Sequence, residues 1–311
     1  MRCGPRTPIL VPMAGPLVVY STPRKLPRAS TLTGRVVVLD LAFASDAGGG
    51  GFEKVTKRFI DDLGDRLAMW IDHHDHQMHA AYRDDPRFVL RTKAQHGACP
   101  ELVTPERVAA AGRVDTICCH GDFDGLCSAA KWLRGGQEPY PDADADARAI
   151  DTRIGVASER ATIIDRALRA RPRDHGLFGL VVRFLAEGGQ DRGLYEHILE
   201  ASADLKRLEA ESRRLALGYR LDGDIAVVDA RERNGSYDKT LLLMIGQERA
   251  PIAVVHDEST VTAAARYDSG IDLLALLGIS GGMPTRVSVA AKNLDQVIEA
   301  LRRRGAVGAG S

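Results

Sequence analysis

Three short apolar runs in this chain each lead directly into a side chain that can bind a metal ion. They are Val36–Leu39 before Asp40, Leu67–Ile71 before Asp72, and Asp115–Cys119 before His120. The runs are short and largely without polar alternation, as strands of a parallel sheet are when both of its faces are covered. Strand and helical patterns alternate, which predicts an α/β fold with a parallel sheet over residues 34–170. Because ligand sites form at the carboxyl ends of such strands, we predict one site at that edge of the sheet.

The segment His120-Gly-Asp122-Phe-Asp124-Gly carries three polar side chains at a period of two. In an extended segment this spacing places all three on one side. One imidazole and two carboxylates form half of a metal site, and divalent ions such as Mn²⁺ accept this set of nitrogen and oxygen ligands. The alternative interpretation is a solvated acidic turn.

The segment Asp72-His73-His74 places two imidazoles side by side at the end of a predicted strand. Adjacent side chains of a strand point to opposite sides, so one histidine would bind metal and the other would face the substrate. Asp40, alone at its strand end, could be an ordinary loop residue. With the other two segments it could instead bridge two cations that lie ~3.5–4 Å apart in a binuclear site.

Composition restricts the classes of partner and compartment. Lys+Arg and Asp+Glu are both 42, so no net basic charge attracts nucleic acid, and a small anionic substrate is the better expectation. Five cysteines without a Cys-x-x-Cys pair argue against a disulfide framework and favour a reducing cytoplasm. The sequence has no apolar run of the ~18 residues that a membrane span requires, so no membrane association is expected.

The length of 311 residues predicts about two domains. Residues 1–33 are rich in proline and are expected to form a disordered arm. Leucines at helical spacing predict a helical connector over 171–217. A second, smaller α/β unit is expected over 218–311, where short apolar runs precede a last helix with a capping box at Asn293 and Gln296.

These motifs resemble those of the DHH phosphoesterase superfamily, which includes RecJ-type exonucleases, nano-RNases and cyclic-dinucleotide phosphodiesterases. The resemblance rests on Asp72-His73-His74, on His120-Gly-Asp-Phe-Asp-Gly and on the strand that leads into Asp40. It implies that His74 contacts the scissile phosphate. It also implies a set of metal ligands: Asp40, His73, His120, Asp122 and Asp124. A last aspartate is expected in an Asp-Thr context, which Asp151-Thr152 matches, with Asp115 as the weaker candidate.

The order of the motifs departs from that of the superfamily. The lone aspartate and the Asp-His-His segment here precede the His-x-Asp-x-Asp segment, so the order is permuted. Residues 218–311 resemble the DHHA1 substrate domain. Arg266, Gly281, Gly282 and Arg286 match its substrate-binding positions, but Met283 or Pro284 stands where the loop histidine is expected.

The function that follows is hydrolysis of phosphodiester bonds in short oligonucleotides or small nucleotides by a two-metal mechanism. Two Mn²⁺ ions are expected as cofactors, with Mg²⁺ as the alternative, and a homodimer is a candidate assembly. A nucleotide phosphatase or pyrophosphatase is the enzymatic alternative. A nucleotide-binding protein whose site has lost its activity is the alternative of another class, and the missing loop histidine is the feature that favours it.

Overall fold

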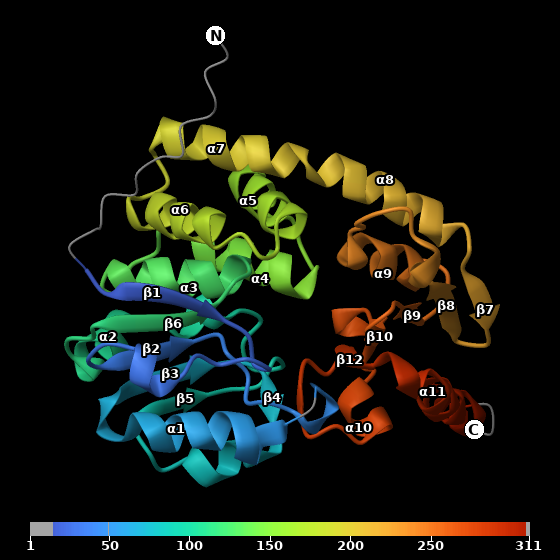
Figure 1. Cartoon of the computed structure of the whole chain (residues 1–311), viewed down its shortest axis with the longest axis horizontal. Coiled ribbons are helices and arrows are strands. Elements are labelled where there is room, and N and C mark those ends of the chain that lie inside the picture. The colour runs from blue at the N-terminus through green and yellow to red at the C-terminus, as the bar shows by residue number, and fades with distance from the viewer. Residues whose placement is uncertain (1–14, 49, 309–311) are drawn as a thin grey trace.

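The computed structural model describes residues 15–48 and 50–308, which form two units, each with a five-stranded sheet (Figure 1). The strands of the first sheet are β1 (Leu17–Ser21), β2 (Val36–Leu39), β3 (Leu67–Asp72), β5 (Phe88–Leu90) and β6 (Thr116–His120). Its helices are α1 (Arg58–Leu63), α2 (Pro105–Ala111), α3 (Phe123–Leu133), α4 (Ala143–Thr152), α5 (Glu159–Ala170), α6 (His175–Ala186) and α7 (Arg192–Ala203). A π-helical segment, Phe52–Lys57, leads into α1.

The first sheet is parallel throughout, in the order β1-β6-β2-β3-β5. This confirms the predicted α/β fold with a parallel sheet. Strand β6 is the last of the five along the chain, yet it lies between β1 and β2. The three strands that precede the metal-type motifs, β6, β2 and β3, are therefore direct neighbours, and their carboxyl ends lie at one edge.

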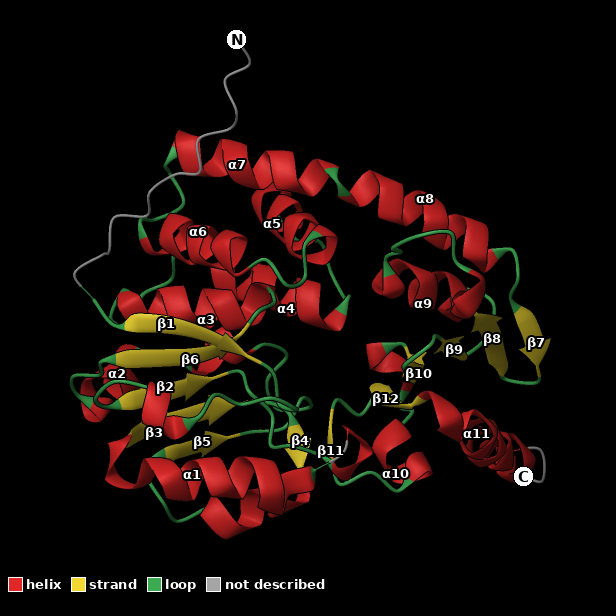
Figure 2. Ribbon diagram, viewed as in Figure 1, coloured by secondary structure: helices red, strands yellow, loops and turns green. Residues whose placement is uncertain are grey.

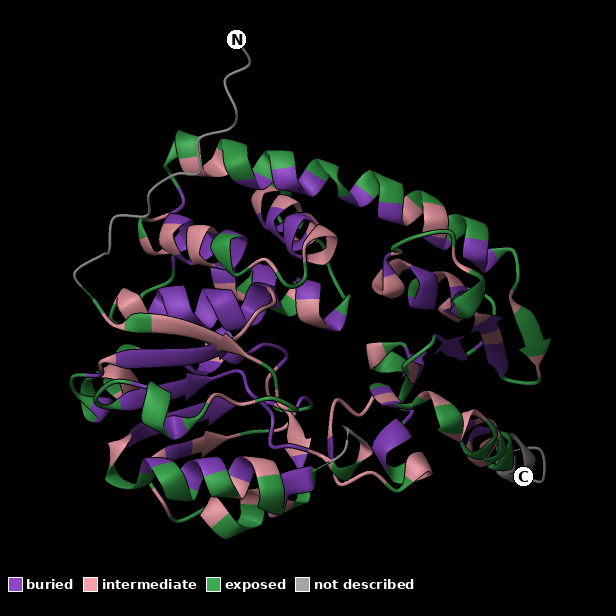
Figure 3. Ribbon diagram, in the orientation of Figure 1, coloured by how far each residue is buried: buried purple, intermediate pink, exposed green. Residues whose placement is uncertain are grey.

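Both faces of this sheet are covered, as the unbroken apolar runs predict (Figure 2). Val37 and Leu39 belong to a core shared with α3 and α6, whereas Val36 and Val38 belong to a second core shared with α1. The central strands are accordingly buried along their whole length (Figure 3). Strand β2 is thus held rigidly on both sides, and so is the residue at its end.

The expectation of a disordered arm is wrong for residues 17–21, because they form β1. This strand pairs in parallel with β6, from Leu17 opposite Thr116 to Ser21 opposite His120. Pro16 and Pro23 lie just outside the strand, so the ladder loses no N–H donor, and an edge strand tolerates prolines at its ends. Residues 1–14 of the expected arm lie outside the described residues.

Helix α8 (Leu205–Ala216) follows α7 almost directly and leads from the first unit to the second (Figure 1). The second sheet has the order β12-β10-β9-β8-β7 and mixes one parallel pair, β8–β9, with antiparallel pairs. Its strands are β7 (Arg220–Asp222), β8 (Ile225–Asp229), β9 (Ile252–His256), β10 (Thr260–Ala265) and β12 (Arg286–Ala290). Its helices are α9 (Lys239–Gln247), α10 (Leu273–Leu277) and α11 (Leu294–Gly308).

A two-stranded antiparallel ribbon joins the units on the side opposite α8. It consists of β4 (Asp75–His76), just after the Asp-His-His segment, and β11 (Gly281–Gly282) of the second unit. The second unit is therefore tied to the first close to the predicted site. No helix among the described residues is long and apolar enough to cross a membrane.

Candidate metal centre

The carboxyl ends of β6, β2 and β3 bring seven predicted site residues into one cluster. Their ligand atoms form three overlapping groups, in each of which the atoms lie within 4.8 Å of one another. The groups are Asp40–His73–His74, Asp40–His120–Asp122 and His73–Asp124–Asp151. Residues from the ends of three strands and from two helices, α3 and α4, therefore meet at one place, although they lie up to 111 positions apart in the sequence (40 to 151).

Asp40 is the centre of the cluster and has an unusual backbone. Its φ of 55° lies in the left-handed region, which costs a non-glycine residue energy and is commonest at functional sites. The backbone N–H donates to the carbonyl of Ile71 at 2.9 Å, which fixes this conformation at the end of β2. The turn directs the carboxylate into the cluster rather than along the strand axis.

The Asp40 carboxylate is buried, at 1% exposure, and neither of its oxygens has a hydrogen-bond partner among the described residues. Burial, followed by the negative charges of Asp124 and Asp122, raises the pKa of Asp40 well above its ordinary value. A buried carboxylate without a partner is costly, and in native proteins such groups are paired or bind metals. These unpartnered oxygens match the ligand that a cation would require.

His73 is fully buried and is oriented by its own backbone contacts. Its Nδ1 lies 3.0 Å from the carbonyl oxygen of His96, so Nδ1 carries a proton and Nε2 is the ring nitrogen that a metal ion could bind. That Nε2 lies 3.3 Å from Oδ1 of Asp40 and 3.2 Å from Oδ2 of Asp124. A carbonyl holding the far nitrogen is the usual arrangement of a metal-binding histidine.

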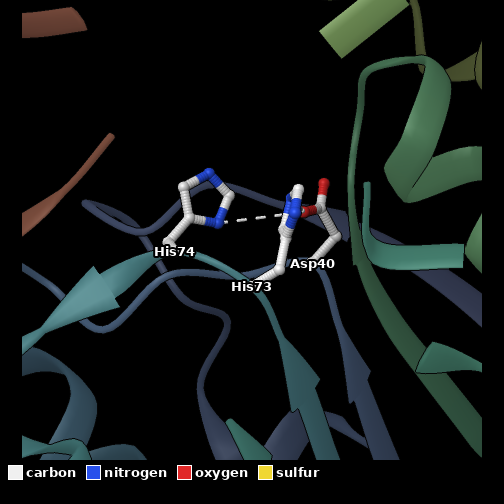
Figure 4. A group of neighbouring side chains, drawn as sticks. All are labelled: Asp40, His73 and His74. Carbon is white, nitrogen blue, oxygen red and sulfur yellow. Dashed lines mark ion pairs between the residues drawn. The ribbon is translucent and has the colours of Figure 1, made fainter. Parts of the chain in front are cut away.

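His74 turns to the other side of the strand end, as the alternation of a strand requires. Its Nδ1 lies 2.9 Å from Oδ1 of Asp72. The same Nδ1 lies 3.9 Å from Oδ1 of Asp40 (Figure 4). Burial alone would raise the pKa of Asp72, but the charge and hydrogen bond of His74 lower it to about 2. Asp72 is therefore ionised and orients the ring of His74, and it is not one of the clustered ligands.

His120 and Asp122 form the side of the cluster that faces solvent. Nδ1 of His120 lies 2.7 Å from Oδ2 of Asp122 and 3.8 Å from Oδ2 of Asp40. Burial lowers the pKa of His120, but the charge and hydrogen bond of Asp122 outweigh it and raise the pKa to about 10. Without a cation the imidazole is protonated, so a metal ion binding there has to displace that proton.

The turn from β6 into α3 is shaped so that both aspartates of the motif serve the cluster. Asp122 caps α3 by accepting from the N–H of Gly125, at 3.3 Å, and Asp124 lies in the first turn. A Cβ at Gly125 would lie 2.6 Å from the carbonyl oxygen of His120 and 3.0 Å from Oδ2 of Asp40. Glycine at this position therefore allows the close approach of β2, β6 and α3.

Asp151, whose assignment rested only on its Asp-Thr context, lies in the last turn of α4 and joins His73 and Asp124 in the third group. Asp115, the weaker candidate, precedes the opposite end of β6. Its Oδ2 accepts from the N–H of Arg35, at 3.0 Å, and it pairs with Arg113. Asp115 therefore holds the entry to the strand, and it lies outside the cluster.

Lys93 is a member of the cluster that the sequence did not reveal. It lies in the loop after β5, and its side chain is buried at 2% exposure. Its Nζ lies 2.9 Å from Nε2 of His73 and donates to Oδ2 of Asp151. No motif or spacing marks this lysine, because it belongs to an irregular loop 20 residues from its imidazole partner.

A cavity of about 860 Å³ opens beside the cluster, between the two units. His120, Asp122, Asp124 and Asp151 line it on one side, and second-unit residues that include Arg266, Tyr267 and Arg286 line the other. The guanidinium of Arg286 has no carboxylate partner among the described residues and lies 3.5 Å from Oγ1 of Thr240. Arg286 is an exposed residue at the start of β12, so its guanidinium is accessible from the cavity.

Three other predicted substrate contacts have different partners in the structure. Arg266 lines the cavity, but its guanidinium forms a bidentate pair with Asp268, at 2.9 Å and 3.1 Å. Gly281 and Gly282 pair with His76 and Asp75 as the β11–β4 ribbon. A Cβ at Gly281 would collide with the ring of His76. Gly281 therefore allows the two units to approach each other closely, which is a role other than the predicted anion loop.

The donor set of the cluster fits a divalent ion. It combines imidazole nitrogens with four carboxylates, the ligands that Mn²⁺ and related ions accept. The orphaned oxygens of Asp40 and the carbonyl-held ring of His73 are independent signs of the same role. The arrangement can place a Lewis acid at the wall of a cavity that is also lined by Arg286, which forms no ion pair with any described residue.

No protein-family model matches the chain, and no curated protein matches it. Among solved structures, it is similar to a pGpG-specific phosphodiesterase, PggH, from Vibrio cholerae, with a TM-score of 0.36 and 13% sequence identity. The match covers 50% of this chain and 64% of that chain, so it spans less than two thirds of the phosphodiesterase.

Proposed function

We propose that this protein is a metal-dependent phosphoesterase that hydrolyses phosphodiester bonds of short oligonucleotides or small nucleotides. The observation that carries the proposal is the buried Asp40 carboxylate, which belongs to two of the three His/Asp groups and whose oxygens have no hydrogen-bond partner in the described part of the chain. This cluster lies at the carboxyl edge of a parallel sheet, where α/β proteins bind their ligands. The resemblance of the motifs to the DHH superfamily agrees with it.

The cavity supports a small anionic substrate. Its volume of about 860 Å³ falls within the ~300–1,000 Å³ of small-molecule sites. One wall carries the cluster and the opposite wall carries Arg286, so a phosphorylated molecule can present one group to each. A guanidinium without a carboxylate partner can bind phosphate with two parallel hydrogen bonds. A nucleotide or short oligonucleotide has both the size and the charge.

A divalent ion, Mn²⁺ with Mg²⁺ as the alternative, would polarise a phosphoryl oxygen and lower the pKa of the attacking water. Asp40, His120 and Asp122 are the residues placed to hold it. His74, oriented by the ionised Asp72, is placed to donate a hydrogen bond to the scissile phosphate. Arg286 holds the remote end of the substrate across the cleft. The sequence motifs predict two ions. Whether both can bind depends on Lys93, because its ammonium contacts His73 and Asp151 in one of the three groups.

The test is hydrolysis by the purified protein with Mn²⁺, after a cycle of EDTA treatment and metal restoration. Asp122→Ala and His120→Ala should each abolish hydrolysis of a dinucleotide, whereas Asp115→Asn, remote from the cluster, should retain it. Wild-type turnover in both of the first two variants would refute the proposal.

The choice of substrates in the same assay separates the enzymatic alternatives. A panel of dinucleotides, cyclic dinucleotides, 3′,5′-bisphosphonucleotide and pyrophosphate distinguishes a phosphodiesterase from a phosphatase or pyrophosphatase. Arg286→Ala should raise KM for the preferred substrate by about tenfold or more, since a charge-assisted hydrogen bond contributes ~1.5–3 kcal/mol. Arg266→Ala is the matched control, because its guanidinium is already paired with Asp268. A nucleotide-binding protein without activity would instead bind members of the panel and release no product.

A further inference from the structure

Lys93 occupies one of the three groups of the cluster. The group consists of His73, Asp124 and Asp151, and the ammonium contacts two of its three members. Its Nζ is 2.9 Å from Nε2 of His73 and donates to the carboxylate of Asp151. A positive charge that belongs to the chain itself therefore lies where a second divalent ion would bind.

The backbone of Lys93 is held on both sides, which keeps the ammonium in this position. Its N–H donates to Oδ2 of Asp75 at 3.1 Å, and its carbonyl accepts a hydrogen bond from the hydroxyl of Tyr267 in the second unit. Asp75 is itself part of the β4–β11 ribbon between the units. The lysine is therefore anchored by the junction and is not a surface side chain folded inward.

A divalent ion bound to His73 and the ammonium of Lys93 cannot occupy the site together. A divalent ion binds an imidazole nitrogen at ~2.0–2.1 Å along its lone pair. Nδ1 of His73 is engaged by the carbonyl of His96, so Nε2 is the ring nitrogen left for an ion, and Nε2 already lies 2.9 Å from Nζ. An ion bound to Nε2 would crowd the ammonium and would place two cations against each other in a buried site.

We propose that Lys93 replaces the second divalent ion, so that the centre binds a single ion in the Asp40–His120–Asp122 group. This inference rests on the proposed function in one respect, since it takes the cluster to bind a divalent ion at all. The ammonium neutralises part of the charge of Asp124 and Asp151, and it leaves Asp40 as a ligand of one ion rather than a bridge between two. The two-ion centre expected from the motifs is thereby reduced to one.

Lys131 offers a matched control within the chain. It is a second buried lysine, donating to Oδ2 of Asp144 and, at 2.9 Å, to the carbonyl of Pro100. Lys131 therefore resembles Lys93 in being buried and in having a carboxylate partner of its own, but it contacts none of the clustered ligands. Removing its charge tests the general effect of deleting a buried lysine.

The experiment counts ions in the full-length protein. Each variant is stripped with EDTA, equilibrated with Mn²⁺ alone, and analysed for bound metal per chain and by electron paramagnetic resonance, in which two adjacent Mn²⁺ ions couple and a single ion does not. We expect one uncoupled ion in the wild type, in Lys93→Arg and in Lys131→Ala. Lys93→Ala, which empties the subsite, should bind a second ion and show the coupled spectrum.

The number of ions bound by the wild type tests the single-ion centre even if a variant fails to fold. Two coupled ions in a wild type that hydrolyses phosphodiesters would overturn the single-ion centre while leaving the proposed function intact. A single ion in both wild type and folded Lys93→Ala would also overturn it, since the lysine would then not be what excludes the second ion. No bound ion in the wild type would overturn this inference and the proposed function together.

Discussion

Replacing Asp40 by asparagine should make the metal-free protein more stable. The two side chains have nearly the same shape, and asparagine tolerates the left-handed backbone at this position. The substitution removes a buried charge whose oxygens have no hydrogen-bond partner among the described residues. Because the pKa of Asp40 is raised, its contribution to stability is complete below ~3.9, the ordinary value, and is lost as pH rises through the raised pKa. At neutral pH the carboxylate therefore opposes folding, and asparagine does not.

The size of the effect follows from the cost of an unsatisfied buried group, ~1–3 kcal/mol and more when charged. At ~2–4 °C per kcal/mol for a unit of 150–250 residues, the EDTA-treated variant should melt about 2–12 °C above the wild type. Saturation with metal should reverse the order. At a hundredfold excess over Kd the wild type gains ~2.7 kcal/mol from Mn²⁺, whereas the variant has lost its central ligand.

Thermal unfolding followed by circular dichroism, in EDTA and in Mn²⁺, measures both effects on the same samples. Asp115→Asn is the control, because that carboxylate has hydrogen-bond partners and lies outside the cluster. Its Mn²⁺-dependent shift should equal that of the wild type. A variant at position 40 that is less stable than wild type in EDTA, and gains as much from Mn²⁺, would contradict the reasoning.

Three further outcomes are expected. Gly125→Ala should abolish Mn²⁺ binding and cost about 1–3 kcal/mol in urea unfolding, whereas Gly235→Ala, which meets no atom within 4 Å, should change stability by less than ~0.5 kcal/mol. Gly281→Ala should lower activity by forcing the β4–β11 ribbon apart. Adding His76→Ala should restore part of it, because the new Cβ would still lie 2.8 Å from the carbonyl oxygen of Asp75; no rescue at all would place the fault elsewhere. Since the pKa of His120 is raised to about 10, the stability that its proton supplies is complete below ~6.5 and lost as pH rises toward 10. Mn²⁺ affinity measured by titration calorimetry should meanwhile strengthen about tenfold per pH unit for one displaced proton.

The parts of this molecule that the sequence predicted are those that depend on a short stretch of chain. Val36–Leu39 is a buried strand because its side chains are apolar on both faces, and that pattern is complete within four residues. Thr104 followed by Pro105 is typical of the start of a helix, and the side chain of Thr104 does accept from the N–H of Arg107 at the start of α2. Once the sheet was predicted to be parallel, the meeting of strand ends followed.

The parts that were missed depend on contacts between distant segments. Strand β1 gains its stability from β6, some 100 residues later, and nothing within its own proline-flanked sequence signals that pairing. Lys93 was missed for the same reason, since its burial is decided by Asp151 and by Tyr267 of the second unit. The glycines of β11 were assigned from a resemblance, and their true neighbour, His76, could be known only from the fold.

The β4–β11 ribbon means that the two units are not interchangeable modules. A fragment ending before β7 would keep every clustered ligand, yet it would lose the Tyr267 hydroxyl that holds the carbonyl of Lys93 and the strand that covers His76. Grafting a different second unit would remove the same two contacts. A replacement second unit could therefore preserve the site only if it met two conditions. It would need a small residue opposite His76 and a hydroxyl group within reach of the Lys93 loop.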